Sequence, residues 1–182
     1  MHRLHLHGRR NWVSIKKYAR FLARHQLRSA GVRASKSLWL WLKTCGEAMH
    51  IDGKCHCGFI SYQAEIDPDE VYICHCTDCQ SFSGSAFRWA VPVAEENFNL
   101  LSGEPKAYVK QAESGALSRQ LFCPECASPI YGTSVGTEPK VFNLRLGSVR
   151  QRGQLRPKTQ YWYRSAQNWT TVHQPCRRFE TE

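Results

Sequence analysis

Three short groups of cysteines constrain this sequence more than any other feature. Seven of the nine cysteines in the 182-residue chain fall in these groups, which are Cys55/Cys57, Cys74/Cys76/Cys79 and Cys123/Cys126. Structural disulfides rarely join such close neighbours, and the chain lacks the long apolar stretch and cleavage site of a secretory signal. Closely spaced thiols bind metal ions readily, so the pattern predicts metal binding rather than disulfide formation.

The spacing within each group suits zinc. On a strand, residues i and i+2 point to the same face with their α-carbons ~6.6 Å apart. Tetrahedral zinc with Zn–S bonds of ~2.3 Å needs sulfurs ~3.8 Å apart, a difference that two leaning side chains can close. Each C-x-C pair can therefore give two ligands to one ion. The C-x-x-C pair has the spacing of a turn-shaped zinc knuckle.

Seven thiolates divide naturally into four and three. Structural zinc sites are closed by four protein ligands, whereas catalytic sites keep three and leave the fourth position for water or substrate. The pairs Cys55/Cys57 and Cys123/Cys126 would form a closed cluster that joins two ends of a sheet. The cysteine trio, Cys74, Cys76 and Cys79, would form an open site. Spacing alone also allows other partitions, such as Cys126 sharing a site with the trio.

The chain from residue 53 onward has a mainly β pattern. Short apolar or alternating runs are separated by turn formers, which favours antiparallel sheets over alternating strands and helices. We expect Pro92 on an edge strand or at a bulge, and helical turns at residues 77–83 and 94–98. We expect Thr77 to cap the first of these turns. The strands are predicted at residues 59–62, 71–74, 86–93, 106–110, 119–122 and 140–146.

The positive charge is confined to the first quarter of the chain. Residues 1–48 contain 11 Lys or Arg and one acid, whereas residues 49–182 contain 14 of each. A basic amphipathic helix here would fit an organellar presequence, a membrane-surface helix or a nucleic-acid arm. An extension that does not fold, or an upstream start before Met49, fits equally. We expect residues 1–48 to lie outside the folded domain, residues 49–182.

Location and partners follow from the same charge distribution. The near-neutral charge of residues 49–182 disfavours nucleic-acid binding by the domain. The apolar run Leu38–Leu42 is far shorter than the ~20 residues that span a bilayer. We therefore expect a cytoplasmic protein, or an organellar one if the basic extension is a presequence.

Several motifs in order resemble the glutathione-dependent formaldehyde-activating family, which includes the centromere protein V group. The resemblance covers about residues 50–172. It rests on GKCHCG at residues 53–58, CHCTDC at 74–79, FRWAVP at 87–92, LLSGEPKAYVKQAESGALSRQLFCPEC at 100–126 and the aromatic residues Tyr161, Trp162, Tyr163 and Trp169.

The resemblance implies coiled antiparallel β-sheets (a β-tent, zinc-ribbon-like) and two Zn²⁺ per chain. It implies a structural zinc on Cys55, Cys57, Cys123 and Cys126, and a catalytic zinc on Cys74, Cys76 and Cys79. The implied activity is that of a carbon–sulfur lyase of the S-(hydroxymethyl)glutathione synthase type, with glutathione and an aldehyde as partners. The alternative is a non-catalytic zinc module with a structural or interaction role.

One residue departs from the family pattern, and two others are candidate substrate contacts. The family usually has Gly after the last cysteine, where this chain has Ala127; a positive φ there would cost Ala roughly 1 kcal/mol. Arg88 and Arg119 could bind glutathione carboxylates. His75 alternates with two ligands, so we expect it to point away from the metal. His173 and Cys176 resemble a further ligand pair, outside the resemblance.

Overall fold

The structure, a computed structural model, describes residues 48–112, 115–136, 140–170 and 177–181. The predicted basic extension, Cys45, His173 and Cys176 lie outside these residues, and the boundary at residue 49 stays a prediction. The described part is mainly β, as the sequence predicts. It contains one α-helix, α3 (Thr77–Ser83), and several short 3₁₀ turns.

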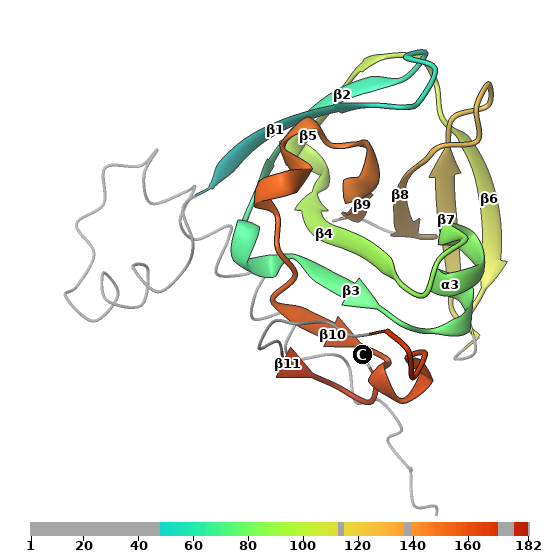
Figure 1. Ribbon diagram of the computed structural model, residues 1–182. Helices are drawn as coiled ribbons and strands as arrows, with labels where there is room; N and C mark the ends of the chain where they lie inside the picture. Colours follow the sequence, from blue (N-terminus) through green and yellow to red (C-terminus); the bar gives the residue numbers. More distant parts are fainter. Residues whose placement is uncertain (1–47, 113–114, 137–139, 171–176, 182) are drawn as a thin grey trace, which may run out of the picture. The chain divides into compact units, whose positions relative to one another are not determined.

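The strands form two sheets, whose order can be followed in Figure 1. The smaller sheet has the order β1-β2-β5, and its strands are β1 (Met49–Lys54), β2 (Ser61–Ile66) and β5 (Phe98–Ser102). The larger has the order β11-β10-β3-β4-β9-β8-β7-β6. Its strands are β3 (Tyr72–Cys74), β4 (Arg88–Ala94), β6 (Lys106–Gln111), β7 (Leu117–Phe122), β8 (Pro129–Ser134), β9 (Val141–Arg145), β10 (Thr159–Tyr161) and β11 (Arg177–Arg178).

The pairing is antiparallel except around β10. This strand pairs in parallel with both β3 and β11, so the larger sheet is mixed. Parallel pairing requires a long connection, and here residues 75–158 provide it between β3 and β10. The C-terminal part of the chain therefore returns to lie beside the strand that carries Cys74.

The core lies between the inward faces of the two sheets. Along β2, buried and half-buried residues alternate, so Tyr62, Ala64 and Ile66 point inward. They belong to a cluster that also contains Val91 and Leu144 from the larger sheet. Burial of these apolar side chains is the main force that holds the sheets together.

Pro92 does not lie on an edge strand as expected, because β4 is flanked by β3 and β9. The pairing of β3 covers only residues 88–90 of β4, while Pro92 itself pairs with Asn143 of β9. On the β3 side, Pro92 thus lies past the end of the ladder. A missing backbone N–H is tolerated there for the same reason as on an edge strand.

Candidate metal centre

The closed cluster brings together four sulfurs from two sheets. Cys55 and Cys57 follow β1, and Cys123 and Cys126 follow β7. All four Sγ atoms lie within 4.8 Å of one another, with Cys55–Cys57 at 3.5 Å and Cys57–Cys123 at 3.7 Å. The predicted link between two ends of one sheet is wrong in this respect: the cluster joins the smaller sheet to the larger one.

Tight turns hold the cysteines of this cluster in place. The Cys55 N–H donates to the Ile60 carbonyl at 2.9 Å, and the Ile60 N–H lies 3.2 Å from Cys55 Sγ. The Ala127 N–H donates to the Cys123 carbonyl at 2.9 Å, and Ala127 has a φ of +57°. The Ser128 hydroxyl, 3.2 Å from Cys126 Sγ, is the main cause that lowers the pKa of Cys126 to about 5.

The cysteine trio lies where β3 passes into α3. Cys74 ends the strand, Cys76 precedes the helix and Cys79 lies in its first turn, with all three Sγ atoms within 4.8 Å of one another. Among the described residues, no fourth His, Cys, Asp or Glu joins this group. Hydrogen bonding with Cys74 and then with Cys79 lowers the pKa of Cys76 to about 2. Hydrogen bonding with Cys76 and then with Cys79 raises the pKa of Cys74.

Helix α3 is capped by a cysteine and not by the expected Thr77. The side chain of Cys76 accepts the Cys79 N–H at 3.4 Å, and Gly84 ends the helix in the left-handed conformation, with a φ of +60°. A sulfur acceptor at this position replaces the usual hydroxyl or carboxylate cap. The same sulfur therefore fixes the helix start and belongs to the trio.

Both donor sets fit zinc. All seven cysteines are free thiols, and the 3.5–3.7 Å sulfur separations of the closed cluster are close to the ~3.8 Å edge of a tetrahedral Zn–S₄ site. They are far longer than the ~2.05 Å of a disulfide bond. Soft thiolate ligands favour zinc, copper(I) and iron–sulfur clusters over hard cations such as magnesium and calcium.

His75 is enclosed behind the trio. It is fully buried, its ring Nε2 lies 2.9 Å from Gln160 Oε1 on β10, and its backbone N–H donates to the Tyr161 carbonyl at 3.0 Å. The amide of Gln80 in α3 donates to the carbonyls of His75 at 2.6 Å and Ser165 at 2.9 Å. The C-terminal segment thus supports the peptide that carries the trio.

Arg88 connects the trio to a cavity of about 1380 Å³. Its Nη2 donates to Cys79 Sγ at 2.7 Å, and its Nη1 donates to Gln120 Oε1 at 2.9 Å. The cavity wall has one acid, Asp52, against five lysines and arginines. The five are Lys54, Arg88, Arg145, Arg150 and Arg152.

Arg145 and Gln120 are parts of this site that sequence reasoning missed. Arg145 is only 6% exposed, and its Nη2 donates to the same Gln120 Oε1 at 2.9 Å. Burial, and then repulsion from Arg88, lowers the pKa of Arg145 to about 10, so it is still charged at neutral pH. The signal in the sequence was an arginine between two leucines, LRL at residues 144–146, at the end of strand β9.

The other predicted site residues lie away from the cavity. Arg119 is exposed and does not line it, since its neighbour Gln120 points inward and adjacent strand residues face opposite ways. Trp169 is 72% exposed, and the Tyr163 ring lies 5.9 Å from that of His75. Phe87 and Trp89 of the FRWAVP motif do line the cavity.

The chain was compared with protein families, curated proteins and solved structures. A family model described as "Glutathione-dependent formaldehyde-activating enzyme" matches residues 50–165. A search of curated proteins found no match. A solved structure described as a Rhodobacter sphaeroides protein and structural genomics target is 16% identical, with a TM-score of 0.44, covering 54% of this chain and 87% of its own.

In the parts of the chain that the structure describes, no helix has the length and apolar character needed to cross a membrane.

Proposed function

The chain belongs to the glutathione-dependent formaldehyde-activating family, and from this premise we propose that it is a zinc-dependent carbon–sulfur lyase. Its substrates would be glutathione–aldehyde adducts such as S-hydroxymethylglutathione, made and broken reversibly. The observation that carries the proposal is the trio of sulfurs with no fourth protein ligand among the described residues.

The two clusters would have different roles. Cys55, Cys57, Cys123 and Cys126 form a complete set of four ligands and would hold a structural zinc. Cys74, Cys76 and Cys79 would hold the catalytic one. Bound there, zinc would supply Lewis acidity and an open position at which a thiol readily loses its proton.

Two neighbouring residues supply positive charge around the trio. The Arg88 guanidinium donates to Cys79 Sγ and so stabilises negative charge on that sulfur. Lys110 forms an ion pair with Asp78, the residue between Thr77 and Cys79. The Asp78 side chain is 48% exposed and so accessible from solvent, whereas His75 is fully enclosed. Of the two nearby proton carriers, the geometry therefore favours Asp78.

In the reaction, the sulfur of glutathione adds to the carbonyl carbon of the aldehyde. A C–S bond forms, the C=O π pair moves to oxygen, and the thiol proton ends on that oxygen. The Asp78 carboxylate would carry this proton between the two positions. The cationic cavity beside Arg88 matches the two carboxylates of glutathione in charge.

Exchange kinetics would test this function. The rate of formaldehyde exchange with glutathione is measured by NMR on the zinc-loaded full chain and in buffer alone. We expect the chain to accelerate exchange about 100-fold or more, the usual scale of positioned acid–base groups. In Cys79→Ser, the acceleration should be lost and bound zinc should fall from two ions to one.

An unchanged exchange rate with two zinc ions bound would contradict the lyase proposal. It would favour the alternative, a non-catalytic zinc module.

A further inference from the structure

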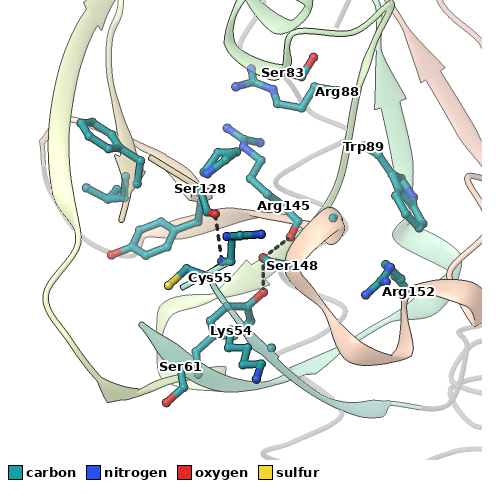
Figure 2. A pocket seen from close by; sticks show the side chains of 18 of the residues that line it. Lys54, Cys55, Ser61, Ser83, Arg88, Trp89, Ser128, Arg145, Ser148 and Arg152 are labelled. Atoms are coloured by element: carbon teal, nitrogen blue, oxygen red, sulfur yellow. Dashed lines mark hydrogen bonds between the residues drawn. The ribbon is translucent and has the colours of Figure 1, made fainter. Parts of the chain in front are cut away.

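Arg88 and Arg145 form a pair of guanidinium groups that share one neutral acceptor. Each donates to Gln120 Oε1 at 2.9 Å, so the two donor nitrogens lie at most 5.8 Å apart (twice 2.9). Among the described residues, no carboxylate forms an ion pair with either group. Two like charges thus share one neutral amide, and Figure 2 shows the side chains of Arg88 and Arg145 at the cavity.

The negative charge of the zinc-bound trio would neutralise only one of these two arginines. Three thiolates on a divalent zinc carry a net charge of −1, which Arg88 offsets through its bond to Cys79 Sγ. Arg145 is 94% buried and forms no bond to a cysteine sulfur among the described contacts. A buried charge without a counter-charge is destabilising, and an anion in the cavity would offset this cost.

The fold holds this pair in place. Arg145 on β9 and Gln120 on β7 approach each other over Gly132 of β8. A Cβ atom on Gly132 would lie 2.6 Å from Arg145 Nη2 and 3.0 Å from Gln120 Oε1. Glycine at this point leaves both side chains where they lie, whereas a larger residue would displace the end of one of them. Arg145, only 6% exposed, is therefore part of the cavity wall and not a surface group.

The carboxylates of glutathione itself have other cationic groups available. Lys54 and Arg152 also line the cavity, and Figure 2 shows both apart from the arginine pair, whereas Arg150 is ion-paired with Asp52. The pair, by contrast, lies one guanidinium away from Cys79. An anion bound to it would lie close to the carbon that bonds to the glutathione sulfur.

We propose that the arginine pair binds a carboxylate carried by the aldehyde, so the carbonyl substrate is a 2-oxo acid of the glyoxylate type and not formaldehyde alone. This inference rests on the proposed function and names its substrate class. The thiol adds across the aldehyde C=O, forming the C–S bond and transferring its proton to oxygen. The carboxylate takes no part in the bond changes, and no oxidant or reductant is needed.

Two stable thioethers test the pair by binding alone. S-(carboxymethyl)glutathione carries the carboxylate, and S-(carbamoylmethyl)glutathione replaces it with a neutral amide of the same size. Calorimetry on the zinc-loaded full chain should give about 10- to 100-fold tighter binding of the acid, as expected for a charge-assisted hydrogen-bonded pair. Equal affinities would overturn the inference.

Three variants test whether the arginine pair is the cause of the tighter binding of the acid. In Arg145→Met the affinity ratio of acid to amide should fall to near one. Since a buried substitution can disturb folding, Gln120→Glu provides a second test: it keeps the side-chain shape and places an internal carboxylate between the arginines, so the ratio should again fall to near one. Arg119→Met, an exposed change on the other face of β7, should keep the full ratio. A ratio that fell equally in Arg119→Met would reflect general charge and would also overturn the inference.

Kinetics then separate this inference from the proposed function. If exchange of glutathione is accelerated with formaldehyde and the acid and amide bind equally, the lyase stands and the inference fails. If the acid binds selectively and neither formaldehyde nor glyoxylate exchange is accelerated, the carboxylate site stands and the lyase fails.

Discussion

The backbone of Ala127 has an unfavourable conformation, and substitution by glycine should remove its energetic cost. Its φ of +57° lies in the left-handed region, which disfavours any side chain with a Cβ atom. We expect Ala127→Gly to raise the free energy of unfolding by about 1 kcal/mol, reduced somewhat by the greater freedom of glycine in the unfolded chain. Chemical denaturation of the zinc-loaded protein measures this.

Ala116→Gly serves as the control for that change. Ala116 is exposed and has no positive φ, so glycine there should lower stability by about 0.5 kcal/mol. A lower stability of Ala127→Gly would contradict the assignment of backbone strain to this position.

Single residues were predictable where ligand chemistry restricts the choice. The spacing within each short group of cysteines follows from sulfur reach and zinc geometry, both of which are local in sequence. The meeting of Cys55/Cys57 with Cys123/Cys126 is not local, and it was implied only by the family resemblance. The positive φ at Ala127 followed from one missing glycine. Arg145 and Gln120 escaped prediction because their meeting depends on three strands of a sheet. The cap at Cys76 escaped because cysteine is not among the usual capping residues.

Strand β1 is held against the turn that follows β9, and a glycine makes this contact possible. A Cβ atom on Gly53 would lie 2.4 Å from the Tyr62 hydroxyl and 2.7 Å from the backbone oxygen of Ser148. Because backbone cannot move aside cheaply, Gly53→Ala should destabilise the fold by about 1–3 kcal/mol. Thermal denaturation measures the loss.

Gly147→Ala is a matched comparison in the adjoining turn, Leu146–Ser148. No atom lies within 4 Å of a Cβ atom built there, and its φ is not in the positive range. Alanine should therefore be neutral or stabilise by up to about 1 kcal/mol. Equal losses in the two variants would mean that the close contact of Gly53 is not what limits stability.

Elements with a clear local pattern were predicted well. Helix α3 has the predicted bounds, 77–83, and all six predicted strands have counterparts in the structure. Strand β8 was missed because it begins with Pro129 and contains Gly132, both of which normally weaken a strand. Strand β10 was missed because it has three residues and buries a polar one, Gln160, whose partner is His75.

At the scale of the whole molecule, zinc bound at the closed cluster would add a strong link between the two sheets to the apolar core that they share. Metal binding of this kind contributes ~10–16 kcal/mol, comparable with the entire stability of a typical domain. We expect Cys123→Ser, or removal of zinc by a chelator, to unfold the protein, seen as loss of far-UV and near-UV circular dichroism. Cys79→Ser should stay folded, because its cluster lies within one sheet and its helix. A folded Cys123→Ser protein without zinc would contradict this role.

The cavity was the part of the molecule that sequence could not predict. Its wall combines residues from β1, β4, β7, β9 and the turns after β9, which local patterns do not relate to one another. The net charge gave no sign of a cationic cavity, since residues 49–182 contain equal numbers of basic and acidic residues. The sheets collect five of the basic side chains, with a single acid, around one space.

The contacts of Gln80 and Gln160 join the peptide around the cysteine trio to a segment that is synthesised much later. The four cysteines of the closed cluster are all available once residue 126 has left the ribosome, and domains fold from the N-terminal side as synthesis proceeds. The trio is translated earlier, yet the partners of His75 and Gln80 arrive only with residues 160–165. A chain that ended before residue 160 would thus contain all seven clustered cysteines but lack the segment that supports the peptide of the trio.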